Sequence, residues 1–181
     1  MAWEIAISAE IAQMANNHAL ERIKFEYDRF GLPTNSRISM ITIGTIGQLV
    51  FKIYLEQQEI PFEFQMQAGK FDDYDFTIDG KKIEVKTSGF ENENDWRNLN
   101  AIYNVNQMKA AVFKKYTASV QIFVNGYDKS ARTFDYTKCN YGIIAGWQFI
   151  DYIASVPKIN LPLGDAHLVP LNNLFPIEKL C

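Results

Sequence analysis

The segment Tyr74–Gly89, YDFTIDGKKIEVKTSG, restricts the possible folds of this 181-residue chain more than any other segment. On both sides of Asp79-Gly80, apolar residues alternate with polar ones, and this two-residue period is typical of a half-buried strand. An Asp-Gly pair favours a two-residue turn between antiparallel strands. The segment therefore predicts a β-hairpin with one apolar and one polar face.

The register of this hairpin places three charged residues together. A two-residue turn pairs Phe76 with Ile83 and Asp75 with Glu84, and the two pairs face opposite sides of the sheet. Lys86 lies two residues after Glu84 and shares its face. Opposed carboxylates, with Cβ atoms about 4.5–5.5 Å apart, repel each other, and a divalent cation bound by both would offset the repulsion. The alternative is a pair of surface carboxylates beside a lysine in a weak, exposed ion pair.

Asp75 followed by Glu84-Val85-Lys86 resembles the catalytic motif of the PD-(D/E)XK nuclease superfamily. There an acidic residue ends one strand and an acid-x-lysine triplet lies on the next; Tyr74 stands where the motif has proline. The resemblance implies that Asp75 and Glu84 bind Mg²⁺, which Mn²⁺ can replace, with the Val85 carbonyl as a further ligand. It also implies that Lys86 assists the water that attacks a phosphodiester.

The same resemblance directs attention to Gln48. Many members of the superfamily carry an acidic residue on the helix before the hairpin, and this chain has Gln48 at the corresponding place, within GTIGQLVFKIY. Gln48 lies off the apolar stripe of its helix. Its amide either holds a water molecule of the metal site or belongs to an ordinary surface glutamine. Gly44 and Gly47, on the same helix, indicate close packing.

Apolar periodicity predicts the elements around the hairpin. Helical spacing extends from Ile7 to about Phe30, from about Ile38 to Gln58 and from about Leu99 to Tyr116. Ala118–Val124 is typical of a buried central strand, whereas Ile143–Ile150 fits either a strand or a helix. We therefore predict an α/β fold with a central mixed β-sheet flanked by helices, and the resemblance makes this fold restriction-endonuclease-like.

Length and composition predict one domain. A chain of 181 residues that is 48% hydrophobic is long enough for one substantial core. We expect that core over about residues 38–126, with an N-terminal helix at about 7–30 and a C-terminal extension at about 127–181. The two cysteines, Cys139 and Cys181, form neither a disulfide framework nor a metal-binding pattern.

Localisation is predicted to be cytoplasmic. The lack of a cysteine framework favours a reducing, intracellular setting. Eighteen consecutive apolar residues occur nowhere, so no membrane span is expected. Acidic residues near the N-terminus also argue against a secretory signal.

Charge restricts the possible partners only in part. A net charge of −3 argues against a protein that coats nucleic acid, but an enzyme that binds a cation through carboxylates carries acidic residues of its own. Some cations of the chain suit contacts with phosphates. They lie in the polar loops Gly89–Asn100 and Tyr127–Tyr141 and, between these loops, at Lys109, Lys114 and Lys115. The alternative is that these loops and this helix face are simply solvated.

The resemblance therefore implies a Mg²⁺-dependent endonuclease. Its substrate would be DNA rather than RNA, cut site-specifically as in restriction, with a homing or repair role as a close second. A homodimer is plausible, because such enzymes often cut two strands with two sites. The alternative from another class is a non-catalytic nucleic-acid-binding or assembly protein that retains the nuclease fold.

Overall fold

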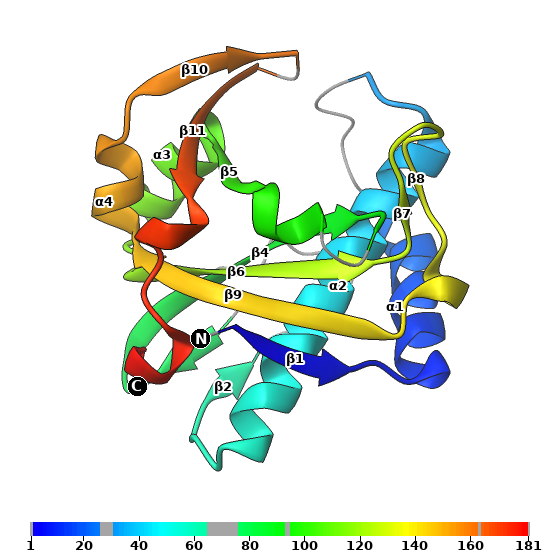
Figure 1. Ribbon diagram of the computed structural model, residues 1–181, viewed down its shortest axis with the longest axis horizontal. Helices are drawn as coiled ribbons and strands as arrows, with labels where there is room; N and C mark the ends of the chain where they lie inside the picture. Colours follow the sequence, from blue (N-terminus) through cyan, green and yellow to red (C-terminus); the bar gives the residue numbers. More distant parts are fainter. Residues whose placement is uncertain (1, 26–30, 65–75, 93–94, 163, 181) are drawn as a thin grey trace.

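The computed structural model describes residues 2–25, 31–64, 76–92, 95–162 and 164–180. Its largest sheet is curled and has six strands in the order β1-β9-β6-β4-β3-β2 (Figure 1). β4 and β6 run parallel and the other neighbours antiparallel, so the predicted α/β fold with a mixed sheet is confirmed. The strands of this sheet are Trp3–Ala6 (β1), Glu63–Phe64 (β2), Phe76–Ile78 (β3), Lys81–Phe90 (β4), Ala118–Asn125 (β6) and Tyr141–Phe149 (β9).

The predicted hairpin is confirmed in its turn and its register. Asp79 and Gly80 have φ angles of 49° and 71°, and a type I′ turn requires positive φ at both central residues. Phe76 pairs with Ile83, as the two-residue turn predicts. Asp75 lies outside the described residues. The described part of the hairpin therefore has the alternation that separates an apolar from a charged face.

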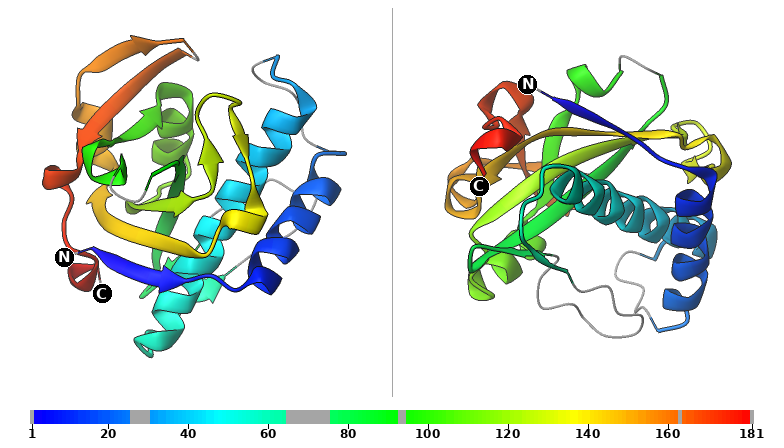
Figure 2. Two further views of the ribbon diagram at one scale, coloured as in Figure 1. Left: turned by 45° about the vertical axis from the view of Figure 1, so that its right-hand side comes forward. Right: turned by 90° about the horizontal axis from the view of Figure 1, so that it is seen from below.

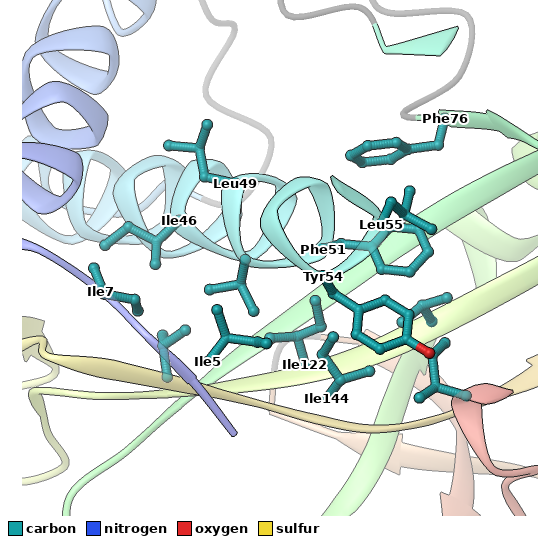
Figure 3. Close-up of a cluster of buried hydrophobic side chains, with 14 of the residues drawn as sticks. Ile5, Ile7, Ile46, Leu49, Phe51, Tyr54, Leu55, Phe76, Ile122 and Ile144 are labelled. Carbon is teal, nitrogen blue, oxygen red and sulfur yellow. The ribbon is translucent and has the colours of Figure 1, made fainter. Parts of the chain in front are cut away.

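Two helices cover the apolar face of the sheet, α1 (Ala9–Arg22) and α2 (Thr34–Gln57). Figure 3 shows Ile46 and Phe51 of α2 above Ile122 of β6, within one cluster of buried apolar side chains. An eighteen-residue window of α2 has a mean hydropathy of 1.5, enough to cross a membrane by length and composition. However, 67% of that window is buried inside the protein, as in the core helix of a soluble protein.

The N-terminal helix is shorter than predicted. We expected helix from Ile7 to about Phe30, and the described helix α1 ends at Arg22, while residues 26–30 lie outside the described part. It begins after Ser8 because the serine hydroxyl accepts a hydrogen bond from a main-chain N–H of the first turn, at 3.3 Å. The sequence did not predict β1, which pairs antiparallel with β9.

A second layer lies on the other face of the sheet. Its three-stranded sheet has the order β10-β11-β5. Its elements are β5 (Asn100–Asn104), α3 (Val105–Phe113), α4 (Ile150–Ser155), β10 (Lys158–Leu161) and β11 (Gly164–Pro170). Tyr103, Met108, Ile150 and Val169 belong to a hydrophobic cluster separate from the one beneath α2. We call these five elements the α3 lobe.

The helix predicted from about Leu99 to Tyr116 is wrong in its first part. Its first residues form strand β5, which pairs antiparallel with β11. Within β5, Ala101 and Tyr103 are buried and Ile102 is 44% exposed, so the two-residue period of a strand applies here. The helix begins only after Asn104, whose side chain accepts a hydrogen bond from a main-chain N–H at 2.9 Å and so caps α3.

The remaining strand predictions are resolved in favour of β structure. The predicted central strand Ala118–Val124 is confirmed, because β6 lies between β4 and β9 and is buried along that length. The run Ile143–Ile150 is strand as far as Phe149 and belongs to β9, after which α4 begins. The shorter elements are η1 (Asp95–Asn98), β7 (Tyr127–Asp128), β8 (Thr133–Phe134), η2 (Tyr136–Lys138), η3 (Leu171–Asn173) and η4 (Ile177–Lys179).

Candidate functional site

Strand β4 separates the core from the candidate site. Thr87 faces α2, because a Cβ placed on Gly47 of that helix would lie only 2.7 Å from the Cβ of Thr87. Side chains alternate along a strand, so Glu84 and Lys86 face the opposite side, toward the α3 lobe. The structure thus brings the two described residues of the predicted catalytic motif to one face.

A pocket of about 300 Å³ opens beside Glu84, between β4 and α3. Glu84 is half-buried, and its Oε2 atom is fully buried. The pocket is lined by Glu84, Asn104, Asn106, Gln107, Ala110, Ala111, Lys114 and Tyr116. A carboxylate at the wall of a pocket that also contains amides and an ammonium group suits a polar or charged ligand.

Gln107 connects the motif to the α3 lobe. Lys86 Nζ donates a hydrogen bond to Gln107 Oε1 at 2.9 Å. Gln107 lies in the first turn of α3, a turn that the Asn104 cap orders. The ammonium of Lys86 is therefore held on the same side of β4 as Glu84. Gln107 was not predicted as a site residue because the helix was expected to begin at about Leu99; an N-cap at Asn104 places Gln107 in the first turn.

Buried polar groups lie beneath the site. Ser119 and Gln121 of β6 are the register partners of Glu84 and Lys86, and both are fully buried. Burial raises the pKa of Tyr103; the nearby Ser119 hydroxyl lowers it, and the charge of Glu84 raises it. Within the described chain, the hydroxyls of Tyr103 and Ser119 lie close but form no hydrogen bond of good geometry. The Glu84 carboxylate thus lies against buried groups, where charges interact more strongly than in water.

The main chain supplies a further oxygen. The Thr117 N–H donates a hydrogen bond to the Lys82 carbonyl at 2.8 Å, so this carbonyl points toward β6. Carbonyls of successive residues point to opposite edges of a strand, which directs the carbonyl of Val85 toward β3. Mg²⁺ prefers oxygen ligands and commonly takes one or two carboxylates. The Glu84 carboxylate and the Val85 carbonyl fit this preference, and Asp75, the other predicted ligand, lies outside the described residues.

Comparisons with known proteins identify no relative of this chain. No family model, no curated protein and no solved structure matches the chain. A functional assignment therefore depends on the chemistry and geometry of the site itself.

Gln48 lies on the other side of β4 from this pocket. It is a half-buried residue of α2 and directly follows Gly47, which packs against Thr87. The described residues that line the pocket beside Glu84 do not include it. The structure thus does not bring Gln48 to the face that carries Glu84 and Lys86, and its role at a metal site stays a prediction.

Two cations of the polar loops, Lys129 and Lys138, pair with carboxylates. Lys129 forms an ion pair with Asp95 at 2.7 Å and so joins the two loops, while Lys138 lies 3.3 Å from Asp135. The hydrogen bond from Lys129 holds the pKa of Asp95 below its usual value, and the same contact raises the pKa of Lys129. Lys114, which directly follows α3, lines the pocket of Glu84.

Proposed function

We propose that this protein is a metal-dependent nuclease of the PD-(D/E)XK type that hydrolyses phosphodiester bonds of DNA. One observation carries the proposal. Glu84 and Lys86 share the face of β4 that looks onto a pocket, and Lys86 is held there by Gln107 at 2.9 Å. A half-buried charged face whose lysine has a hydrogen-bond partner on a neighbouring helix favours a functional site over a solvated hairpin surface.

The arrangement of elements supports a restriction-endonuclease-like fold. The helix α2 precedes the hairpin β3–β4, α3 follows it, and β6 then returns beside β4 in the parallel direction. This is the order that the resemblance implies for the superfamily. The chain order of the described elements therefore supports the proposed fold. We also propose a cytoplasmic setting for the enzyme.

Each residue of the site has a distinct task in this proposal. Glu84 and the Val85 carbonyl hold the cation together with Asp75. Lys86 orients the attacking water and interacts with a phosphate oxygen through its ammonium group. Gln107 is a positioning residue, because it lines the pocket and accepts a hydrogen bond from Lys86, which holds the ammonium beside α3. When bound, Mg²⁺ polarises the phosphate and stabilises the charge that develops on it.

Cleavage of DNA by single variants tests this proposal. Purified protein and the variants Asp75→Ala, Glu84→Gln, Lys86→Ala and Gln107→Ala are incubated with plasmid and genomic DNA in Mg²⁺, Mn²⁺ or EDTA. We expect cleavage only with metal, and a rate loss of roughly 10²–10⁴-fold for Lys86→Ala, the range for a positioned acid–base group. Gln107→Ala should lose less, because Lys86 itself remains. Discrete fragments would indicate a site-specific enzyme and a smear a nonspecific one.

Lys81→Ala is the matched control for Lys86→Ala. Lys81 begins the same strand but is exposed beside the turn, so its loss should leave the rate unchanged. Equal losses for Lys81→Ala and Lys86→Ala would contradict the assigned roles. Absence of metal-dependent cleavage of DNA and RNA by the unmodified protein would overturn the nuclease proposal and favour a protein that only binds nucleic acid.

A further inference from the structure

Phe113, the last residue of α3, is exposed to solvent over most of its side chain. Its side chain is 87% exposed, the largest value among the exposed large hydrophobic residues of the described part. A ring with this exposure contributes almost nothing to the core, and its apolar surface remains in contact with water. Phe113 therefore offers both of its faces to a partner.

The position of Phe113 on its helix brings it to the rim of the Glu84 pocket. Asn106, Ala110 and Phe113 are spaced i, i+4 and i+7, so they share one stripe of α3. Asn106 and Ala110 line the pocket, and so does Lys114, which directly follows Phe113. The ring therefore extends this stripe of α3 beyond the residues that line the pocket.

The chain around this ring is basic. Between Trp96 and Tyr127 the sequence contains four basic residues and no acidic one, although the whole chain has a net charge of −3. Three of these are Lys109, Lys114 and Lys115, on α3 or directly after it. An aromatic ring among lysines is the combination that binds single-stranded nucleic acid, because bases stack on the ring while cations contact phosphates.

We propose that Phe113 stacks on an unpaired base of the substrate, whose backbone lies along Lys109 and Lys114. The proposal rests on the proposed nuclease function and specifies its substrate class: single-stranded or locally unpaired nucleic acid near the scissile bond. In a continuous duplex both faces of a base are covered by its neighbours, so a ring gains access only where stacking is interrupted. Such a substrate presents a base to Phe113 and a phosphate to Glu84 and Lys86.

Binding measured without cleavage tests this inference. Fluorescence anisotropy in EDTA compares a labelled single-stranded oligonucleotide with its duplex, for the unmodified protein and for Phe113→Ala and Phe113→Trp. The matched control is Phe25→Ala, since Phe25 is 69% exposed and follows α1, on the opposite side of the molecule from α3 (Figures 1 and 2). All three substitutions are at exposed side chains and should leave the fold intact.

Phe113→Ala should weaken single-strand binding by about 5- to 150-fold, the range for losing one stacked base, and duplex binding much less. Phe113→Trp should retain binding, and Phe25→Ala should not change it. Unchanged single-strand affinity in Phe113→Ala would overturn the inference, as would equal losses for single strand and duplex. Dissociation of a dimer by Phe113→Ala in sedimentation would also overturn it, because a second copy would then cover the ring.

The two proposals fail in distinguishable ways. If the unmodified protein cleaves with metal but Phe113→Ala binds single strands normally, only the stacking inference is contradicted. If Phe113→Ala loses single-strand binding but the unmodified protein never cleaves, only the nuclease activity is contradicted. If the unmodified protein binds neither form of nucleic acid, both are contradicted.

Discussion

Replacement of Gly47 by alanine should destabilise the protein through one contact between α2 and β4. The added Cβ would overlap Oγ1 of Thr87 and lie 2.7 Å from its Cβ and Cγ2. Thr87 has little freedom to move, because its strand lies between two others in the sheet and its β-branched side chain has few rotamers. Either α2 or β4 must therefore shift.

The change in the free energy of unfolding is the difference between two opposing effects of the added methyl group. Overpacking a core costs about 1–3 kcal/mol, whereas an alanine in a helix is favoured over glycine by about 1 kcal/mol. Because three atoms of a constrained side chain are affected, we expect the upper part of the first range and a net loss of about 2 kcal/mol. With a urea dependence of about 1–3 kcal/mol per molar, the unfolding midpoint falls by about 1 M.

Gly44→Ala is the matched control in the urea experiment. Gly44 lies on the same helix, and a Cβ placed there meets no atom within 4 Å, so its replacement should stabilise by up to about 1 kcal/mol. In a Thr87→Ala background, Gly47→Ala should cost less, because part of the overlap is removed. If Gly47→Ala stabilises as much as Gly44→Ala, α2 does not rest on β4 through this contact, and the reasoning is refuted.

Two further predictions concern buried groups. Burial raises the pKa of Cys139 from 9.0 to about 12, so the folded state keeps the thiol protonated. The contribution of this thiol to the free energy of unfolding is therefore complete below pH 9 and is lost as the pH rises toward 12. In a Cys181→Ser background, Cys139 should react with a thiol reagent only after unfolding, and rapid reaction of the native protein would contradict its burial. Tyr103→Phe should change the unfolding free energy by less than about 1 kcal/mol, because the hydroxyl has no well-formed hydrogen bond in the described chain. A urea-measured loss of more than twice that amount would show a partner for this hydroxyl.

The hairpin was predictable because its determinants are local. Asp79 and Gly80 adopt positive φ angles, which glycine takes without steric cost and aspartate tolerates better than most residues. A two-residue period then assigns each residue of β4 to a face. The close packing inferred from the glycines of α2 is present at Gly47 but not at Gly44. Sequence alone does not distinguish the two, because the difference is the Thr87 side chain of another strand.

The wrong or missing predictions concern segments whose structure depends on pairing with distant parts of the chain. The segment that forms β5 has apolar residues that also fit a helix, and it becomes a strand because β11, far along the chain, pairs with it. β1 likewise depends on β9. The same error concealed Gln107, since the site contact of Lys86 comes from the first turn of a helix whose start was misplaced. The contact between Lys86 and Gln107 thus depends on long-range pairing that no local pattern contains.

The separate hydrophobic cluster of the α3 lobe has a consequence for evolution. Glu84 and Lys86 belong to a strand whose other face is part of the main core, so few substitutions on β4 preserve both the chemistry and the packing. Asn106, Ala110 and Phe113 lie on a helix whose buried residues pack within their own cluster. Mutations along this stripe of α3 can therefore accumulate without disturbing Glu84 and Lys86. Under the proposed nuclease function, divergent descendants of this chain would keep the reaction and change the substrates on which it acts.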